Sequence, residues 1–267
     1  MPCPIFIISL PTATARQAAI AKQLDALGAA YEFVPGIYGT DERVMSRYDE
    51  ALTIKERKKP MLIGERGCAL AHALVHERIV REQIPVALIL EDDIVFPSDF
   101  MTVLASEVNR PGRDWDWLLF DYRYIGWTYL KDWCRATRDT IVKRPRFFWY
   151  ALLKSFYIFP LTLVEGVRDA LARRFPSLRG PGRFYRPLFN AGAYLLTYEG
   201  AKKLIPLTTP LRFTADELPN IARRRVGLRY FGYIPLIVKQ NTVDFETDAG
   251  KTNEVWKQIL SNLGQGS

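Results

Sequence analysis

The sequence contains little cysteine and little histidine. Its 267 residues include two histidines and three cysteines, Cys3, Cys68 and Cys134. The cysteines are far apart and odd in number, and no CxxC pair occurs, so the sequence indicates neither a zinc knuckle nor a disulfide framework. This cysteine usage is typical of a reducing compartment, and we expect a cytoplasmic protein.

The common signatures of nucleotide binding and nucleophilic catalysis are also absent. No GxGxxG follows a strand, and neither GxxxxGK[ST] nor GxSxG occurs, which argues against dinucleotide-binding, P-loop and serine-hydrolase sites. The N-terminus has no basic residue before its short apolar run, so we interpret that run as a first strand and not as a signal peptide.

The composition is that of a globular protein, with 48% hydrophobic and 25% charged residues. We expect one catalytic domain over residues 1–267. Strand-like and helix-like segments alternate up to residue 121, which predicts an α/β fold with a mostly parallel sheet and helices on both faces. The expected strands are residues 4–9, 31–34, 86–91 and 114–121, and the expected helices follow residues 14, 64 and 98.

Several local signals refine this pattern. Thr14 and Gln17 have capping-box spacing, and Gly28 is placed to end the first helix. We expect residues 40–60 to be a loop with at most one helical turn. After residue 188 the periodicity predicts a strand at 192–198, a short helix that ends at Pro206, a second helix from 214, and two closing strands.

Three carboxylates follow the apolar run of VALILEDDIVF, residues 86–96. Adjacent acids repel one another and lose hydration when buried, so Glu91, Asp92 and Asp93 are best tolerated beside a cation or basic partners. Ligands of open α/β sheets bind beyond the carboxyl ends of the strands. The triplet therefore indicates a magnesium or manganese site that bridges to substrate phosphates. The alternative is that two of the acids cap the following turn and the third faces solvent.

The two histidines, His72 and His76, stand four residues apart on one predicted helix and could reach a single ion. The pattern HALVH lacks the general-base glutamate of HExxH zinc sites, and His72 lies in the apolar stripe. We therefore interpret His72 as a hydrogen-bonded, partly buried histidine and not as a zinc ligand. Gly64 and Gly67 precede them in a predicted loop, where they either let a ligand approach the backbone or form a plain turn.

Four blocks in order resemble glycosyltransferase family 25, the family of bacterial lipooligosaccharide or lipopolysaccharide (LPS) galactosyltransferases and collagen galactosyltransferases. The blocks are IFIISLPTATAR, GERGCALAHALVHERIV, PVALILEDDIVF, and NAGAYLLTYEGAKKLI followed by TADEL. They span most of the chain except residues 125–187. The resemblance implies a GT-A-like (Rossmann-like) fold, a UDP-sugar donor, commonly UDP-galactose, a divalent cation (Mn²⁺ or Mg²⁺), and inversion at the sugar carbon.

The resemblance also implies roles for individual residues. Asp93 is the expected direct metal ligand, with Glu91 beside it. The residues expected toward the nucleotide are Ser9, Arg16, Gly64, Gly67, Glu91 and Asp92. Asp216, or alternatively Glu217, is the expected general base for the acceptor hydroxyl. Without the resemblance, Asp216 is better interpreted as an ordinary residue at a helix start.

A basic, aromatic-rich insertion of helices and loops is expected at about 125–187. Residues 131–186 contain thirteen Lys or Arg against four acids, a net +9, whereas the whole chain has +8. The apolar stretch 147–167 is interrupted by Lys154, Pro160 and Glu165, so it predicts an amphipathic segment on an anionic membrane surface and not a span. A helical cap with solvated arginines is the alternative. No nucleic-acid motif occurs, and we expect no nucleic-acid partner.

The leading hypothesis is thus a metal-dependent, inverting hexosyltransferase that acts on a glycolipid or oligosaccharide acceptor at the inner face of the cell membrane. One alternative is another sugar-nucleotide enzyme, such as a nucleotidyltransferase, for which we can assign no phosphate-activating Lys or Arg near the acids. The other is a membrane-associated, sugar-nucleotide-binding protein without turnover. The retained acids argue against this last alternative, because their charges have to be neutralised.

Overall fold

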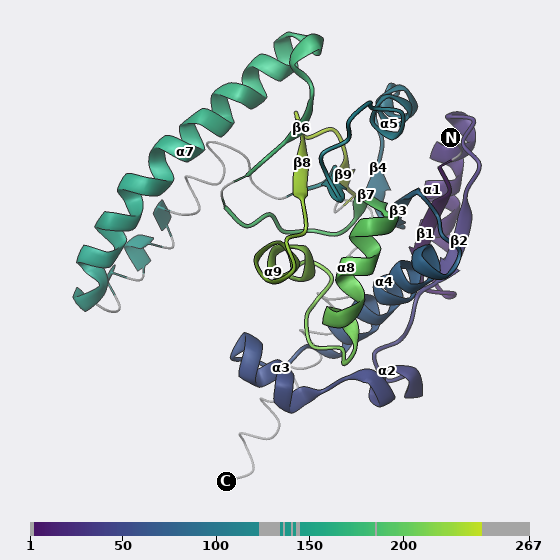
Figure 1. The fold of residues 1–267 in the computed structure, drawn as a ribbon, viewed down its shortest axis with the longest axis horizontal. Helices are drawn as coiled ribbons and strands as arrows, with labels where there is room; N and C mark the ends of the chain where they lie inside the picture. The colour runs from purple at the N-terminus through teal and green to yellow at the C-terminus, as the bar shows by residue number, and fades with distance from the viewer. Residues whose placement is uncertain are drawn as a thin grey trace.

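The computed structural model describes residues 3–122, 134–135, 137–139, 141–142, 145–184 and 186–241. The first part of the predicted insertion, 125–133, lies outside them, as do residues beyond 241. Figure 1 shows a central sheet with helices packed around it and one long helix at the side of the molecule.

The central sheet has seven strands in the order β2-β1-β3-β7-β5-β8-β6. β1 pairs in parallel with β2 and β3, and β5 pairs in parallel with β8, while β7 and β6 run antiparallel to their neighbours. Five strands therefore share one direction, as the sequence predicted. Their bounds are β1 Ile5–Ser9, β2 Glu32–Pro35, β3 Val86–Glu91, β5 Trp117–Leu119, β6 Gly180–Gly182, β7 Ala193–Thr197 and β8 Tyr230–Ile234.

Alternate residues of the central strands face two separate cores. Ile7 and Leu88 contact the core formed with α1 (Thr14–Ala26) and α5 (Phe100–Val108). Phe6 and Ile89 contact the opposite core, formed with α4 (Ile63–Arg81), α8 (Tyr198–Thr208) and α9 (Leu218–Arg225). Because side chains alternate across a strand, a continuous apolar run fits a sheet covered on both faces. This confirms the predicted fold class.

The prediction of a loop at 40–60 was wrong. Two helices form there, α2 (Glu42–Arg47) and α3 (Glu50–Arg57). Each begins after an aspartate whose carboxylate accepts a backbone N–H, Asp41 from Arg43 at 2.9 Å and Asp49 from Leu52 at 2.7 Å. These caps satisfy otherwise unpaired donors and outweigh the lack of a strong apolar stripe.

Two predicted helix ends also differ. The capping box was wrong, because Thr14 is already helical and Gln17 donates instead to the Leu10 carbonyl at 2.9 Å. Pro206 lies inside α8, which continues to Thr208. Because proline has no backbone N–H, it removes one backbone hydrogen bond, but it does not stop a helix that is within one turn of its end. Gly28, at φ +67°, follows α1 as expected.

The described part of the insertion contains a long helix, α7 (Phe148–Arg174), between two 3₁₀ turns, η1 (Pro145–Phe147) and η2 (Pro176–Leu178). Figure 1 shows α7 apart from the sheet along most of its length. The chain then adds β6 to the sheet edge beside β8, a strand that the sequence did not predict. A separate pair of short strands, β4 (Ile94–Val95) and β9 (Lys239–Gln240), lies next to the acidic triplet.

Candidate active site

A cavity of about 640 Å³ opens beyond the carboxyl ends of β1 and β3. This is where an open α/β sheet binds its ligands. Its wall is completed by residues 36–40, by the first turns of α4 and by residues 214–216. The predicted site residues that line it are Ser9, Arg16, Gly64, Glu91, Asp92, Asp93 and Asp216.

The acidic triplet is held in place by two pieces of sheet. β3 is buried from Val86 to Leu90 and ends at Glu91. Asp92 and Asp93 form the turn into β4, and the backbone N–H of Asn241, directly after β9, donates to the Asp93 carbonyl at 2.6 Å. The backbone of the turn is therefore fixed on both sides.

Asp92 is bound by residues from the first strand and helix. The Ser9 hydroxyl donates to its Oδ2 at 2.6 Å, and Arg16 Nη1 lies 3.5 Å from its Oδ1. Asp92 is itself buried, with 7% of its surface exposed. Ser9 and Arg16, both predicted for the nucleotide side, thus orient one acid of the triplet and bring a positive charge to the cavity wall.

Asp93 is in a different situation. Its Oδ1 is buried and has no hydrogen-bond partner among the described residues. Burial, followed by the negative charges of Glu91 and Asp92, raises the pKa of the Asp93 carboxyl to about 7. A buried carboxylate oxygen without a donor is costly, and a cation at this position would remove the cost.

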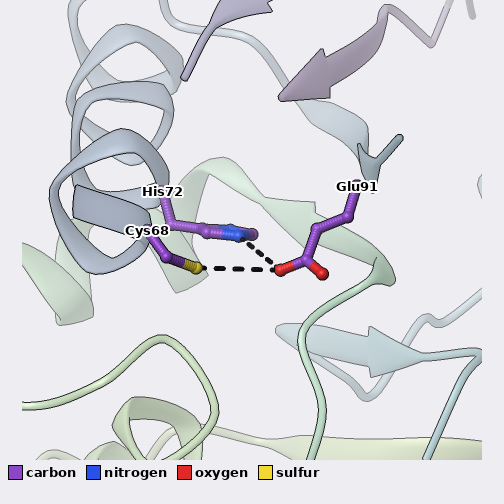
Figure 2. A group of neighbouring side chains, drawn as sticks. All are labelled: Cys68, His72 and Glu91. Carbon is purple, nitrogen blue, oxygen red and sulfur yellow. Dashed lines mark hydrogen bonds and ion pairs between the residues drawn. The ribbon is translucent and has the colours of Figure 1, made fainter. Parts of the chain in front are cut away.

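Glu91 contacts two side chains of α4, as Figure 2 shows. His72 Nε2 lies 3.3 Å and Cys68 Sγ 3.8 Å from the same oxygen, Glu91 Oε1. Burial raises the pKa of this carboxyl, but the hydrogen bond and charge of His72, the Cys68 thiol and Arg16 together bring it below its ordinary value. The surroundings of Glu91 thus favour its charged form, whereas those of Asp93 oppose it.

The two histidines are buried and hydrogen-bonded, a state that the sequence predicted for His72 alone and only with partial burial. His72 Nδ1 and His76 Nε2 each lie 2.8 Å from the Tyr194 hydroxyl. That hydroxyl stands between the two rings, so the pair does not share an ion. Burial lowers the pKa of His76 well below its usual range. Trp117 stacks on Tyr194 with a centroid distance of 3.9 Å.

The predicted loop at 64–67 is wrong, because α4 already begins at Ile63. Gly64 lines the cavity from the first helical turn, whereas Gly67 does not line it. A β-carbon on Gly67 would lie 2.1 Å from the Ile37 carbonyl oxygen, and one on Gly39 would lie 1.8 Å from the Ile63 carbonyl oxygen. Gly67 and Gly39 therefore allow α4 to pack closely on the 36–40 segment, and this packing explains Gly67 better than a turn does.

The two predicted general-base residues are separated. Asp216 lines the cavity. Glu217 is not among its lining residues and forms a two-point ion pair with Arg57, at 2.5 Å from Nε and 3.1 Å from Nη2. Of the two carboxylates, Asp216 is the one that a bound acceptor could reach.

Sequence reasoning did not find the grouping of Cys68, His72 and Tyr194 around Glu91. The spacing of Cys68 and His72, four residues apart on one helix, was a usable signal because such residues share a helix face. Tyr194 gave no signal, since it reads as an ordinary apolar strand position. Asp121, which follows β5, binds the backbone N–H groups of Gly192 and Ala193 at 3.1 and 3.0 Å and so has a structural role.

Together these features define an α/β protein with carboxylates and an arginine around a cavity at the carboxyl ends of its strands. Such a site suits a divalent cation and a ligand with phosphate groups. The family is defined by sequence: the profile of glycosyltransferase family 25 (LPS biosynthesis protein) matches residues 3–146, and the chain belongs to this family. Its structure has the predicted α/β architecture, a mostly parallel sheet with helices on both faces.

Relatives carry the same family name. The chain is 34% identical over 126 residues to a glycosyltransferase 25 family member of Anopheles gambiae and 31% identical over 134 residues to one of Drosophila melanogaster. These matches cover 43% and 48% of this chain and 21% of each relative, so the chain spans about a fifth of the length of these curated relatives. Among solved structures, a glycosyltransferase involved in the glycosylation of the major capsid of PBCV-1 aligns over 96% of this chain and 100% of its own, with 10% identity and a TM-score of 0.41.

Proposed function

We propose that this chain is a metal-dependent, inverting glycosyltransferase that moves galactose from UDP-galactose to a hydroxyl of a lipooligosaccharide-type acceptor. The observation that carries the proposal is the buried, unpartnered Oδ1 of Asp93 beside Glu91 and Asp92 in a cavity of about 640 Å³. Family membership supports the reaction class, and the cavity is of a size typical for small-molecule ligands.

The residues present fit Mn²⁺ or Mg²⁺. Asp93 would be the direct ligand, Glu91 lies beside it, and Asp92 is already bound by Ser9 and Arg16. When bound, the cation neutralises charge on the diphosphate of the leaving UDP. Arg16 adds a fixed positive charge on the same side of the cavity.

Asp216 is the proposed general base. In an inverting transfer, the acceptor oxygen forms a bond to the sugar carbon while the bond from that carbon to the diphosphate breaks. The acceptor's proton passes to a carboxylate on the opposite side of the sugar. Asp216 lines the cavity on the segment that precedes α9 and can take that role.

We also propose that α7 places the enzyme on an anionic membrane surface, where a glycolipid acceptor is found. Large apolar residues are exposed along it at intervals of three and four: Trp149, Leu152, Phe156, Phe159, Leu163, Val167 and Leu171. Residues at this spacing form one stripe of a helix. With the net +9 of residues 131–186, this is the pattern of a helix lying in the membrane interface.

The helix is fixed to the body by its C-terminal half. Ala172 is fully buried in the core, and the buried Glu165 accepts from Arg186 Nε at 2.8 Å. Among the described residues, no helix combines the length and the hydropathy that a membrane crossing requires. In this proposal α7 lies on the inner face of the cell membrane and does not cross it.

The test is release of UDP from a panel of UDP-sugars, with and without Mn²⁺, in the presence of a lipooligosaccharide acceptor. Wild type should turn over UDP-galactose only with the cation. Asp93→Asn, which removes the charge and keeps the shape, should lower kcat/KM by more than about 100-fold, since the cation is worth several kcal/mol in the transition state.

The matched control is Asp114→Asn. Its carboxylate is 59% exposed and forms a 4.0 Å ion pair with Arg183, so its loss should leave turnover unchanged. Turnover of another UDP-sugar would correct the donor alone. Metal-independent turnover, or no binding of any UDP-sugar, would overturn the proposal.

A further inference from the structure

Cys68 and His72, to which the proposed transfer assigns no role, form a group with Glu91 of the acidic triplet. Cys68 and His72 stand one turn apart on α4, and Glu91 ends β3 across the cavity wall (Figure 2). Cys68 Sγ, His72 Nε2 and a Glu91 carboxylate oxygen all lie within 4.8 Å of one another. His72 is 1% exposed, and all three residues line the cavity.

The distances match those around one small ion. Zinc binds nitrogen and oxygen at about 2.0 to 2.2 Å and sulfur at about 2.3 Å, so two ligands of a tetrahedral ion lie about 3.3 to 3.8 Å apart. The nitrogen-to-oxygen distance from His72 to Glu91 is 3.3 Å, and the sulfur-to-oxygen distance from Cys68 is 3.8 Å. Two of the three distances between ligand atoms therefore already match those around one ion, and the third, between Cys68 and His72, is within 4.8 Å.

The second nitrogen of His72 supports the same geometry. Nδ1 lies 2.8 Å from the Tyr194 hydroxyl, which also lies 2.8 Å from His76 Nε2. With an ion on Nε2, His72 donates Nδ1–H to Tyr194, and Tyr194 donates its hydroxyl hydrogen to His76. Metal-bound histidines characteristically donate their other ring N–H to such a partner, which fixes the ring.

We propose that Cys68, His72 and Glu91 bind a zinc ion that is distinct from the cation at Asp93, with the fourth position open to the cavity for a water or substrate oxygen. A thiolate, a carboxylate and a neutral imidazole carry two negative charges, which Zn²⁺ balances. Sulfur and nitrogen ligands select this ion over Mg²⁺. Binding displaces the thiol proton of Cys68, so one proton is released per ion. The ion would join α4 to the end of the strand that carries the acidic triplet.

Metal content and a cobalt spectrum test this site without any assay of transfer. The purified full chain should retain about one zinc per molecule after exchange into chelator-free buffer. With Co²⁺ in its place, the protein should show the near-ultraviolet charge-transfer band of a thiolate ligand. Cys68→Ser should abolish this band and lower zinc affinity by more than about 10-fold.

Two control variants distinguish zinc at Cys68 from zinc held by another thiol or by the Asp93 site. Cys134→Ser changes an exposed cysteine elsewhere and should keep both the zinc and the band. Asp93→Asn should also keep them, while it loses Mn²⁺ dependence. Zinc should raise the melting temperature of wild type but not that of Cys68→Ser. The melting transition of Cys68→Ser itself also shows that the variant folds.

A chain that binds no zinc, or a band that persists in Cys68→Ser, would overturn the proposed site. Loss of the band in Asp93→Asn would show that there is one shared cation and no separate zinc. None of these results depends on the identity of the sugar donor, so failure of this site and failure of the proposed transferase activity are distinguishable.

Discussion

At the scale of single residues, neighbouring acids of one triplet differ because their partners differ. Asp92 is bound from β1 and α1 and Glu91 from α4, whereas no described residue donates to the buried Oδ1 of Asp93. The sequence predicted that these three acids form a site, because three charges after a buried strand need neutralisation. It did not predict their division of roles, which depends on side chains 19 to 83 positions away.

The separation of Asp216 from Glu217 gives a prediction. Asp216→Asn should lower kcat by about 100- to 10,000-fold, because general-base catalysis contributes that much, while KM for the donor changes little. Glu217→Gln leaves the cavity lining intact and weakens the pair with Arg57. It should lower the melting temperature and leave kcat near that of wild type. Steady-state kinetics of the two variants would decide which of the two carboxylates is the general base. A larger kcat loss in Glu217→Gln would reverse the assignment.

At the scale of elements, the periodicity of apolar residues predicted the sheet and its helices but missed features set by contact between distant segments. Helices α2 and α3 are short and polar, and aspartate caps and tertiary packing determine them more than periodicity does. Gly64 and Gly67 suggested a loop because glycine disfavours helices. Close approach of α4 to the 36–40 segment is the reason for Gly67, and this contact cannot be read from local sequence.

This contact can be tested with Gly67→Ala. The new methyl group would meet the Ile37 carbonyl oxygen at 2.1 Å, so the 36–40 segment must move and the cavity wall with it. We expect a loss of about 1 to 3 kcal/mol in unfolding free energy and weaker donor binding, measured by urea denaturation and calorimetry. The control, Gly28→Ala, adds strain at φ +67° after α1, at a residue that does not line the cavity. It should cost about 1 kcal/mol without changing donor affinity.

A buried ion cluster joins β5, α8 and β8. Asp116 has no exposed surface and accepts from Lys203 Nζ at 2.6 Å and from Arg229 Nη2 at 2.7 Å. Burial opposes ionisation, but the hydrogen bonds from Arg229 and Lys203 hold the pKa of the Asp116 carboxyl below its ordinary value. Asp116→Asn should therefore destabilise the fold by about 1 to 3 kcal/mol, since it removes the charge that binds two cations, Lys203 and Arg229, which are themselves 32% and 46% exposed.

The pH dependence of this contribution follows from the direction of the shift. Because the folded-state pKa is lowered, stability from Asp116 is fully present above the unfolded value of about 3.9 and is lost as the pH falls through the lower folded value. Urea unfolding of wild type and Asp116→Asn should differ at pH 7 and converge below pH 4. A difference that stays constant down to acid pH would contradict this assignment.

At the scale of the whole molecule, charge and exposed apolar surface are concentrated in the same segment. Residues 131–186 carry +9, while the rest of the chain is close to neutral. α7 exposes Trp149, Leu153 and Phe156 to between 70% and 74%. Composition and interrupted hydropathy predicted an amphipathic segment. They did not predict that it would be one 27-residue helix through Pro160, about 40 Å long, that lies apart from the sheet.

This arrangement predicts a salt-sensitive preference for anionic membranes. The full chain should sediment with vesicles of phosphatidylcholine and phosphatidylglycerol and bind pure phosphatidylcholine at least about 10-fold more weakly, because each basic residue near an anionic surface adds about 1 kcal/mol. Raising the salt should weaken binding, since it screens exposed charges.

Trp149→Ser with Phe156→Ser should reduce binding to the anionic vesicles as well, because the apolar stripe supplies the inserted area. Met45→Ser, which alters a residue that is 62% exposed on α2, is the control and should bind as wild type does. If the double variant binds anionic vesicles as tightly as wild type, the stripe on α7 is not the surface that meets the membrane. If wild type binds neither kind of vesicle, the acceptor must reach the cavity from solution.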